Sequence, residues 1–159
     1  MKTKPLTCLL ALTFLFLFSG SVFGDDFQNA RDAIDKEDYK TAHQIFLKLA
    51  KKGHVEAQFN LALIYDLGKG VPKNHKEAVK WYRLAAEQGL AEAQLNLGVN
   101  YGLGRGVPQD YVLAHMWHNL AGSNGNEIAI KMRNILAKEM TPQQLEKAQE
   151  MARNWKPKK

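Results

Sequence analysis

A 36-residue repeat constrains the fold of this chain more than any other feature of its sequence. Residues 53–88 align without a gap to residues 89–124, and 16 of the 36 positions are identical. A fixed period of this length is typical of solenoid proteins, in which each unit is buried only by its neighbours. The residues of the first copy that recur in the second are Gly53, Glu56, Ala57, Gln58, Asn60, Leu61, Tyr65, Leu67, Gly68, Gly70, Val71, Pro72, Ala78, Trp81, Leu84 and Ala85.

Each copy reads as a pair of helices. In the first copy, Ala57, Leu61, Ile64 and Tyr65 follow helical spacing and predict one apolar stripe along a helix over Val55–Leu67. The same spacing returns 36 residues later and predicts a second such helix over Ala91–Leu103.

Glycine and proline mark the turn between the two helices of a pair. Gly68 is expected to end the first helix, and Gly70 offers a second position that tolerates positive φ. Pro72 prevents one helix from running through the turn. The second helix carries Trp81 among small alanines, which predicts close helix contact, and Gly89 ends it and starts the next copy.

These residues resemble a known family. Residues 91–111 read Ala-Glu-Ala-Gln-Leu-Asn-Leu-Gly-Val-Asn-Tyr-Gly-Leu-Gly-Arg-Gly-Val-Pro-Gln-Asp-Tyr, and an Ala-x-x-Trp motif and a closing glycine complete the pattern. This pattern resembles the Sel1-like repeat of the tetratricopeptide-like class, and the resemblance covers roughly residues 39–129. It implies an all-α, right-handed αα-superhelix of two full repeats with N- and C-terminal capping helices.

The resemblance and the register together divide the chain. We expect a signal peptide at 1–24 and one repeat domain at 25–159, comprising an N-terminal cap (25–52), two repeats (53–88 and 89–124) and a C-terminal cap (125–159). The C-terminal cap should contain a helix that starts at Thr141-Pro142, where threonine caps, proline takes the first position and Gln144 completes a capping box.

The N-terminus has the features of a secretory signal. Lys2 and Lys4 precede the apolar segment Leu6–Phe18, and small residues before Asp25 predict cleavage there. The segment is shorter than the roughly 20 residues of a membrane span, although an uncleaved anchor is the alternative. We therefore expect an exported protein, periplasmic or secreted, with no stable membrane span after cleavage. The single cysteine, Cys8, lies inside this segment, so the mature chain is held by packing without disulfides.

Charge excludes one class of partner. Loss of the two leader lysines lowers the net charge from +6 to +4, and the remaining basic residues are dispersed. A nucleic-acid binder needs a dense basic stripe with stacking aromatics, which this sequence lacks. The charge leaves room only for weak attraction to anionic envelope polymers. The cysteine-poor mature chain also departs from the disulfide-stapled secreted branch of the Sel1-like family, so the penicillin-binding or β-lactamase-like activity of that branch is not carried over.

A search for catalytic or cofactor motifs gives no candidate. The Gly-x-Gly runs close a helix instead of opening one after a strand, so they read as helix caps and not as a nucleotide loop. His115 and His118 stand three residues apart on one predicted helix, yet no third ligand lies nearby in sequence, and packing is the better interpretation. We predict no enzyme activity, no metal and no cofactor.

The predicted binding surface lies on the first helix of each repeat, which the resemblance assigns to the concave side. Asn96 and Asn100, one turn apart, could hold an extended peptide backbone with paired amides. Because Asn60 and Asn96 recur between repeats, a structural role for these two is an open alternative. The candidate binding residues are Asn60, Leu63, Asn96, Val99, Asn100 and Leu103.

The sequence therefore predicts an exported interaction scaffold that binds a protein or peptide partner on its concave face. One alternative is an envelope enzyme or enzyme-modifier acting on cell-wall glycopeptides, which two acids converging in one groove would support. A second alternative is a structural subunit of a larger assembly, which a contiguous exposed apolar patch would support.

Overall fold

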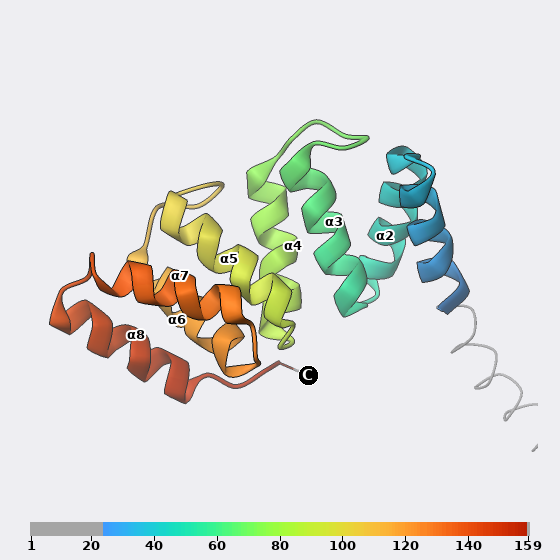
Figure 1. Cartoon of the computed structure of the whole chain (residues 1–159). Coiled ribbons are helices and arrows are strands. Elements are labelled where there is room, and N and C mark those ends of the chain that lie inside the picture. Colours follow the sequence, from blue (N-terminus) through green and yellow to red (C-terminus); the bar gives the residue numbers. More distant parts are fainter. Residues whose placement is uncertain (1–23, 159) are drawn as a thin grey trace, which may run out of the picture.

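The computed structural model describes residues 24–158, and every regular element in that range is a helix (Figure 1). The predicted signal peptide at 1–24 lies outside the described residues apart from Gly24. No helix between residues 24 and 158 is long and apolar enough to cross a membrane. An N-terminal helix over residues 24–35 is followed by α2 (Tyr39–Lys51), α3 (Val55–Leu67), α4 (His75–Glu87), α5 (Ala91–Leu103), α6 (Tyr111–Ser123), α7 (Glu127–Ala137) and α8 (Pro142–Asn154).

The helices keep the period of the sequence. α2, α4 and α6 begin at residues 39, 75 and 111, and α3, α5 and α7 begin at residues 55, 91 and 127. The hairpins α3–α4 and α5–α6 pack side by side and the array proceeds in an arc from the N-terminal helix towards α7 (Figure 1). The all-α solenoid predicted from the repeat is confirmed. The N-terminal helix is out of register, because the turn after it spans residues 36–38 whereas the turn between α3 and α4 spans residues 68–74. α8 is also out of register, since it begins at residue 142 and the period would place its start at 147.

Side chains cap the second helix of each pair at equivalent positions. Asp38, Asn74 and Asp110, spaced at the repeat period, each accept a hydrogen bond from the backbone N–H three residues ahead. Such a cap stabilises a helix start by about 1 kcal/mol. Thr141 and Gln144 form the predicted capping box at the start of α8.

The turn between the helices of a pair reaches back to the preceding pair. Gly70 has a φ of +73°, as predicted, and a Cβ at this position would lie 2.7 Å from the backbone carbon of Tyr39 at the start of α2. Gly106 has a φ of +69°, and its Cβ would meet the backbone of His75 and Lys76 at the start of α4. In both repeats the turn therefore sets the step from one pair to the next, and glycine is required by conformation and by space.

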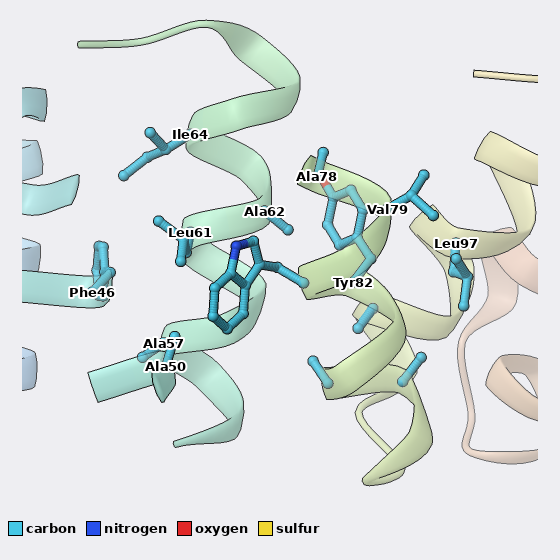
Figure 2. Packing of buried hydrophobic residues seen from close by; sticks show 14 of the residues in the cluster. Phe46, Ala50, Ala57, Leu61, Ala62, Ile64, Ala78, Val79, Tyr82 and Leu97 are labelled. Carbon is cyan, nitrogen blue, oxygen red and sulfur yellow. The ribbon is translucent and has the colours of Figure 1, made fainter. Parts of the chain in front are cut away.

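The core runs as one continuous cluster through the array. Phe46, Leu61, Tyr82 and Leu97 are fully buried, and small alanines between them let the helix backbones approach closely (Figure 2). Burial and the nearby Asp66 carboxylate raise the pKa of Tyr82, so its phenol stays neutral.

A recurring glutamine connects successive pairs through buried hydrogen bonds. The Nε2 atom of Gln58 donates to the carbonyl oxygen of Ala50 at 3.2 Å, and Gln94 donates to Ala86 at 3.2 Å in the next repeat. Gln88 in turn donates to the side-chain oxygen of Gln58 at 2.8 Å. The identical glutamines of the repeat are therefore structural, because each satisfies a carbonyl at the end of the preceding second helix.

The C-terminal end departs from the regular hairpin pattern. α8 packs against α6 instead of pairing with α7, and Trp155 meets Trp117 edge to face. The tail then returns to the end of α4, where Lys158 bonds Glu87 through backbone and side chain. α7 consequently buries only Ala129 fully, and it leaves Ile128 and Ile135 exposed.

Overpacking at Ala85 should destabilise the protein. Ala85 on α4 is fully buried in the core cluster. We expect Ala85→Leu to lower the free energy of unfolding by about 2 kcal/mol, because the added atoms must push two helices apart. Urea unfolding followed by circular dichroism measures this change. The neighbouring Leu84 is 39% exposed, and Leu84→Ala should change stability by about 0.5 kcal/mol or less. An Ala85→Leu variant as stable as the wild type would contradict close packing here.

Candidate binding face

The surface formed by the N-terminal helix, α3, α5 and α7 is called the first-helix face below. All six predicted binding residues lie on two of these helices, α3 and α5, although not all of them reach the surface. Asn60 and Asn96 occupy equivalent half-buried positions, and each donates its amide to the carbonyl oxygen four residues back in its own helix, at 2.7 Å and 2.9 Å. These bonds engage one donor of each amide, so the side-chain oxygens stay available to another molecule.

Asn100 lies where the sequence analysis did not expect it. Its side chain is only 2% exposed, and its Nδ2 atom donates to the carbonyl oxygen of Asn96 at 2.8 Å. Its Oδ1 atom is buried without a hydrogen-bond partner. Asn100 thus points into the packed layer, and the expected pair of open amides on α5 does not form. The equivalent residue in the first repeat, Ile64, is buried as well at 3% exposure.

The N-terminal hollow, as we call it, opens between the N-terminal helix, α3 and the start of α5. Its volume is about 380 Å³, and it includes the predicted residue Asn60. Its lining combines aromatic, aliphatic and charged side chains; the lining residues are Phe27, Arg31, Glu56, Phe59, Asn60, Leu90 and Glu92. Leu63 lies farther along α3, half-buried against the core, and lines neither this hollow nor the one described next.

The C-terminal hollow opens at the other end of the first helices, between α5, α6 and α7. Its volume is about 230 Å³, and it includes the predicted residues Val99 and Leu103. Leu103 and Ile135 are exposed at its rim by 55% and 58%. The lining is mainly apolar; its residues are Gly98, Val99, Gly102, Leu103, Tyr111, His118, Met132, Ile135, Leu136 and Glu139.

The corresponding place in the first repeat holds a polar cluster. The Asp66 carboxylate of α3 lies 2.6 Å from Nδ1 of His75, and Tyr82 donates its hydroxyl to the same carboxylate at 3.5 Å. Asp66 is only 18% exposed in its side chain, so the contact ties α3 firmly to α4.

In the second repeat all three positions of this cluster are different. Gly102 stands in place of Asp66, Tyr111 in place of His75, and His118 in place of Tyr82. Each of these three residues lines the C-terminal hollow. The hollow therefore appears where the second repeat lacks the carboxylate that the first repeat has.

Two histidines of α6 are buried, and one of them, His118, lines the C-terminal hollow. His115 and His118 on α6 are 3% and 1% exposed, and the Nδ1 atom of each is buried without a partner. Burial, together with the neighbouring His115, lowers the pKa of His118 to about 4. Burial and the charge of Arg133 also lower the pKa of His115. Both rings are neutral at pH 7, and among residues 24–158 no three potential ligands gather to hold a metal ion.

Sequence reasoning missed Phe59, Gly102 and His118 as residues that line the hollows. The available signal was a departure from the repeat: Gly98 and Gly102 replace Ala62 and Asp66 on otherwise similar helices. The loss of two side chains on one helix face predicts missing volume at that place.

Comparison with known proteins supports the repeat assignment. The profile of the Sel1 repeat matches residues 27–54, 55–90 and 91–126, so it also covers the segment expected to form the N-terminal cap. A putative sel1-like repeat-containing protein of Acanthamoeba polyphaga mimivirus is 49% identical over 37 residues, which are 23% of this chain and 7% of that protein.

Two solved structures share the fold. A protective antigen present in uropathogenic Escherichia coli strains, which displays an SLR fold, superimposes with a TM-score of 0.80 at 37% identity over 84% of this chain. A Sel1 repeat protein from Oxalobacter formigenes superimposes with a TM-score of 0.59 at 41% identity over 60% of this chain. This chain spans 29% and 40% of the lengths of those two chains.

Proposed function

This chain belongs to the Sel1 repeat family, and from that premise we propose that it is an interaction scaffold that binds a peptide or protein segment on its first-helix face. Sel1 repeat proteins generally mediate protein–protein interaction. The observation that carries the proposal is the pair of hollows on this face, which contain the predicted residues Asn60, Val99 and Leu103.

The mechanism is rigid display. The turns at Gly70 and Gly106 fix each step of the array, and the glutamine bonds of Gln58 and Gln94 join successive pairs. The binding positions are thus held in place before a partner arrives, so little ordering is required upon binding. The two hollows lie towards opposite ends of the first helices, so a bound segment crosses the face diagonally.

Export is part of the same proposal. The segment Met1–Gly24 supports a secretory leader with cleavage before Asp25. The protein would then meet its partner in the periplasm or outside the cell. N-terminal sequencing of the protein recovered from cell fractions tests this: a cytoplasmic chain that retains Met1–Gly24 would contradict it.

One observation bears on the enzyme alternative. Glu56 and Glu92 line the same hollow, as two acids of a glycosidase would. However, the Glu56 side chain is 59% exposed and lies 3.2 Å from His54. A general acid of this class works in an apolar site that excludes water, which this position does not offer. The binding function is therefore the better supported of the two.

Selection of binding peptides from a random display library tests the proposed function. We expect selected peptides to shift NMR resonances of α3, α5 and α7, and the double variant Asn60→Ala with Leu103→Ala to bind them about tenfold more weakly. The matched control is Lys80→Ala with Leu84→Ala on α4, two exposed positions outside the first-helix face. Peptides that bind the control variant more weakly and the first variant normally would overturn the proposal, as would a selection that yields no binder.

A further inference from the structure

The C-terminal hollow allows a more specific statement about the partner, which rests on the proposed function. Its floor is formed by Gly98 and Gly102, where the first repeat has Ala62 and Asp66. Packing requires a glycine at one of these two positions and not at the other.

Gly98 is required by packing. A Cβ at this position would lie 2.7 Å from Cε1 and Nδ1 of the His118 ring. Gly102, in contrast, has room: its Cβ would meet only the Cβ of Ala114, at 3.7 Å, an ordinary contact. Glycine inside a helix lowers helix stability relative to alanine. Since the fold does not need Gly102, its effect is to keep the hollow open.

His118 lines the hollow from the α6 side. Its side chain is 1% exposed and lines the hollow, and its Nδ1 atom has no hydrogen-bond partner. In the first repeat the equivalent residue, Tyr82, donates its hydroxyl to Asp66. At the rim, Leu103 and Ile135 leave more than half of their side-chain surface in water. This combination of open floor and exposed apolar rim is typical of a place where a side chain of another molecule inserts.

The charges around the two hollows indicate the composition of the partner. The charged lining residues are the acids Glu56, Glu92 and Glu139 and the single base Arg31. The whole chain has the opposite balance, with 22 lysines and arginines against 16 acids. The lining of the two hollows is therefore more acidic than the chain as a whole, which favours a partner segment that carries lysine or arginine.

We infer that the C-terminal hollow is an anchor pocket that receives one large apolar side chain from a basic polypeptide segment. Its volume of about 230 Å³ is sufficient, since a buried apolar cavity of about 150 Å³ already holds a benzene ring. Val99, Leu103 and Ile135 form the apolar wall, and Glu139 at the rim attracts the flanking base.

A set of short peptides tests this inference by NMR titration of the purified protein. Ac-Lys-Phe-Lys-NH₂ should shift the amide resonances of Gly98, Val99, Gly102 and Ile135. The analogue Ac-Lys-Ala-Lys-NH₂, which lacks the anchor, should bind at least about tenfold more weakly. The charge-reversed analogue Ac-Glu-Phe-Glu-NH₂ should bind about threefold more weakly or worse.

Variants of the chain provide the matched controls. Gly102→Leu fills the hollow and should reduce binding of Ac-Lys-Phe-Lys-NH₂ at least about tenfold, while its melting temperature stays at or above that of the wild type. Leu103→Ala should weaken binding, whereas Leu67→Ala, at the equivalent position of the first repeat and 56% exposed, should not. Equal binding by wild type and Gly102→Leu, or equal binding of the two phenylalanine peptides, would overturn the inference.

Two further outcomes separate this inference from the proposed function. If display-selected peptides bind the first-helix face but Gly102→Leu binds them normally, the anchor pocket is wrong and the scaffold function stands. If no peptide is selected and Ac-Lys-Phe-Lys-NH₂ does not bind either, both the anchor pocket and the scaffold function are wrong. A dimer in sedimentation experiments that Gly102→Leu dissociates would show that a second copy occupies the hollow, and this too would overturn the inference.

Discussion

Replacing Gly106 by alanine is expected to lower the free energy of unfolding by about 3 kcal/mol. Two causes combine. The φ of +69° is unfavourable for any side chain, and the new Cβ would meet the backbone of His75 and Lys76 in the preceding pair. Backbone atoms at the start of α4 cannot turn aside as a flexible side chain can. Urea unfolding of the two proteins measures the difference.

Another glycine of the chain serves as a control for the loss of stability that positive φ alone causes. Gly125 has a φ of +87°, but a Cβ there would meet no atom within 4 Å. Gly125→Ala should therefore cost only about 1 kcal/mol. The excess at Gly106 then measures the contact between successive pairs. Equal losses at the two positions would show that the turn does not press against α4.

The second large effect is a loss of stability in acid that depends on His118. Its pKa is lowered to about 4 in the folded protein, chiefly by burial, whereas an unfolded histidine titrates near pH 6.5. Between these values the unfolded chain takes up a proton that the folded chain does not, so stability falls as the pH falls from about 6.5 to about 4. The expected loss from this residue is about 3 kcal/mol.

The groups around His118 do not reverse this sign. His115 on the same helix shifts in the same direction, Arg133 on α7 adds positive charge, and Glu139 lies at the rim of the hollow. Unfolding by urea at about pH 7.5 and pH 4 should show a smaller loss in His118→Phe than in the wild type, by about 3 kcal/mol. The variant keeps a ring in the same place but cannot titrate. Identical pH dependence in the two proteins would show that the ring is already protonated or solvated in the fold.

Much of the fold could be predicted because local signals and the repeat agree. The bounds Val55–Leu67 and Ala91–Leu103 match the sequence prediction, since each helix ends in a glycine that adopts positive φ. The capping box at Thr141 could likewise be predicted from the four residues Thr141 to Gln144. α8 was different: its stripe was visible, but its choice of α6 over α7 depends on contacts between distant residues such as Trp117 and Trp155.

The candidate site was only partly predictable. Asn100 was placed on the surface because it lies one turn from Asn96, where two amides could form a pair, although the equivalent residue of the first repeat, Ile64, belonged to the predicted core stripe. The 36-residue alignment with Ile64 would have predicted correctly that Asn100 is buried. The hollows depend on the position of α7 and of the N-terminal helix relative to their neighbours, and no periodic pattern within one helix contains that information.

The contact between a turn glycine and the preceding pair has a geometric consequence for recognition. Gly106 lies between the N-terminal and the C-terminal hollow along the array, and in a stack of units a small tilt at one joint displaces everything beyond it. A tilt at Gly106 would leave the C-terminal hollow intact, but it would move Leu90 and Glu92 relative to α3 and so change both the N-terminal hollow and the distance between the two. A ligand that spans both hollows would lose affinity, whereas a short ligand confined to the C-terminal hollow would bind as before.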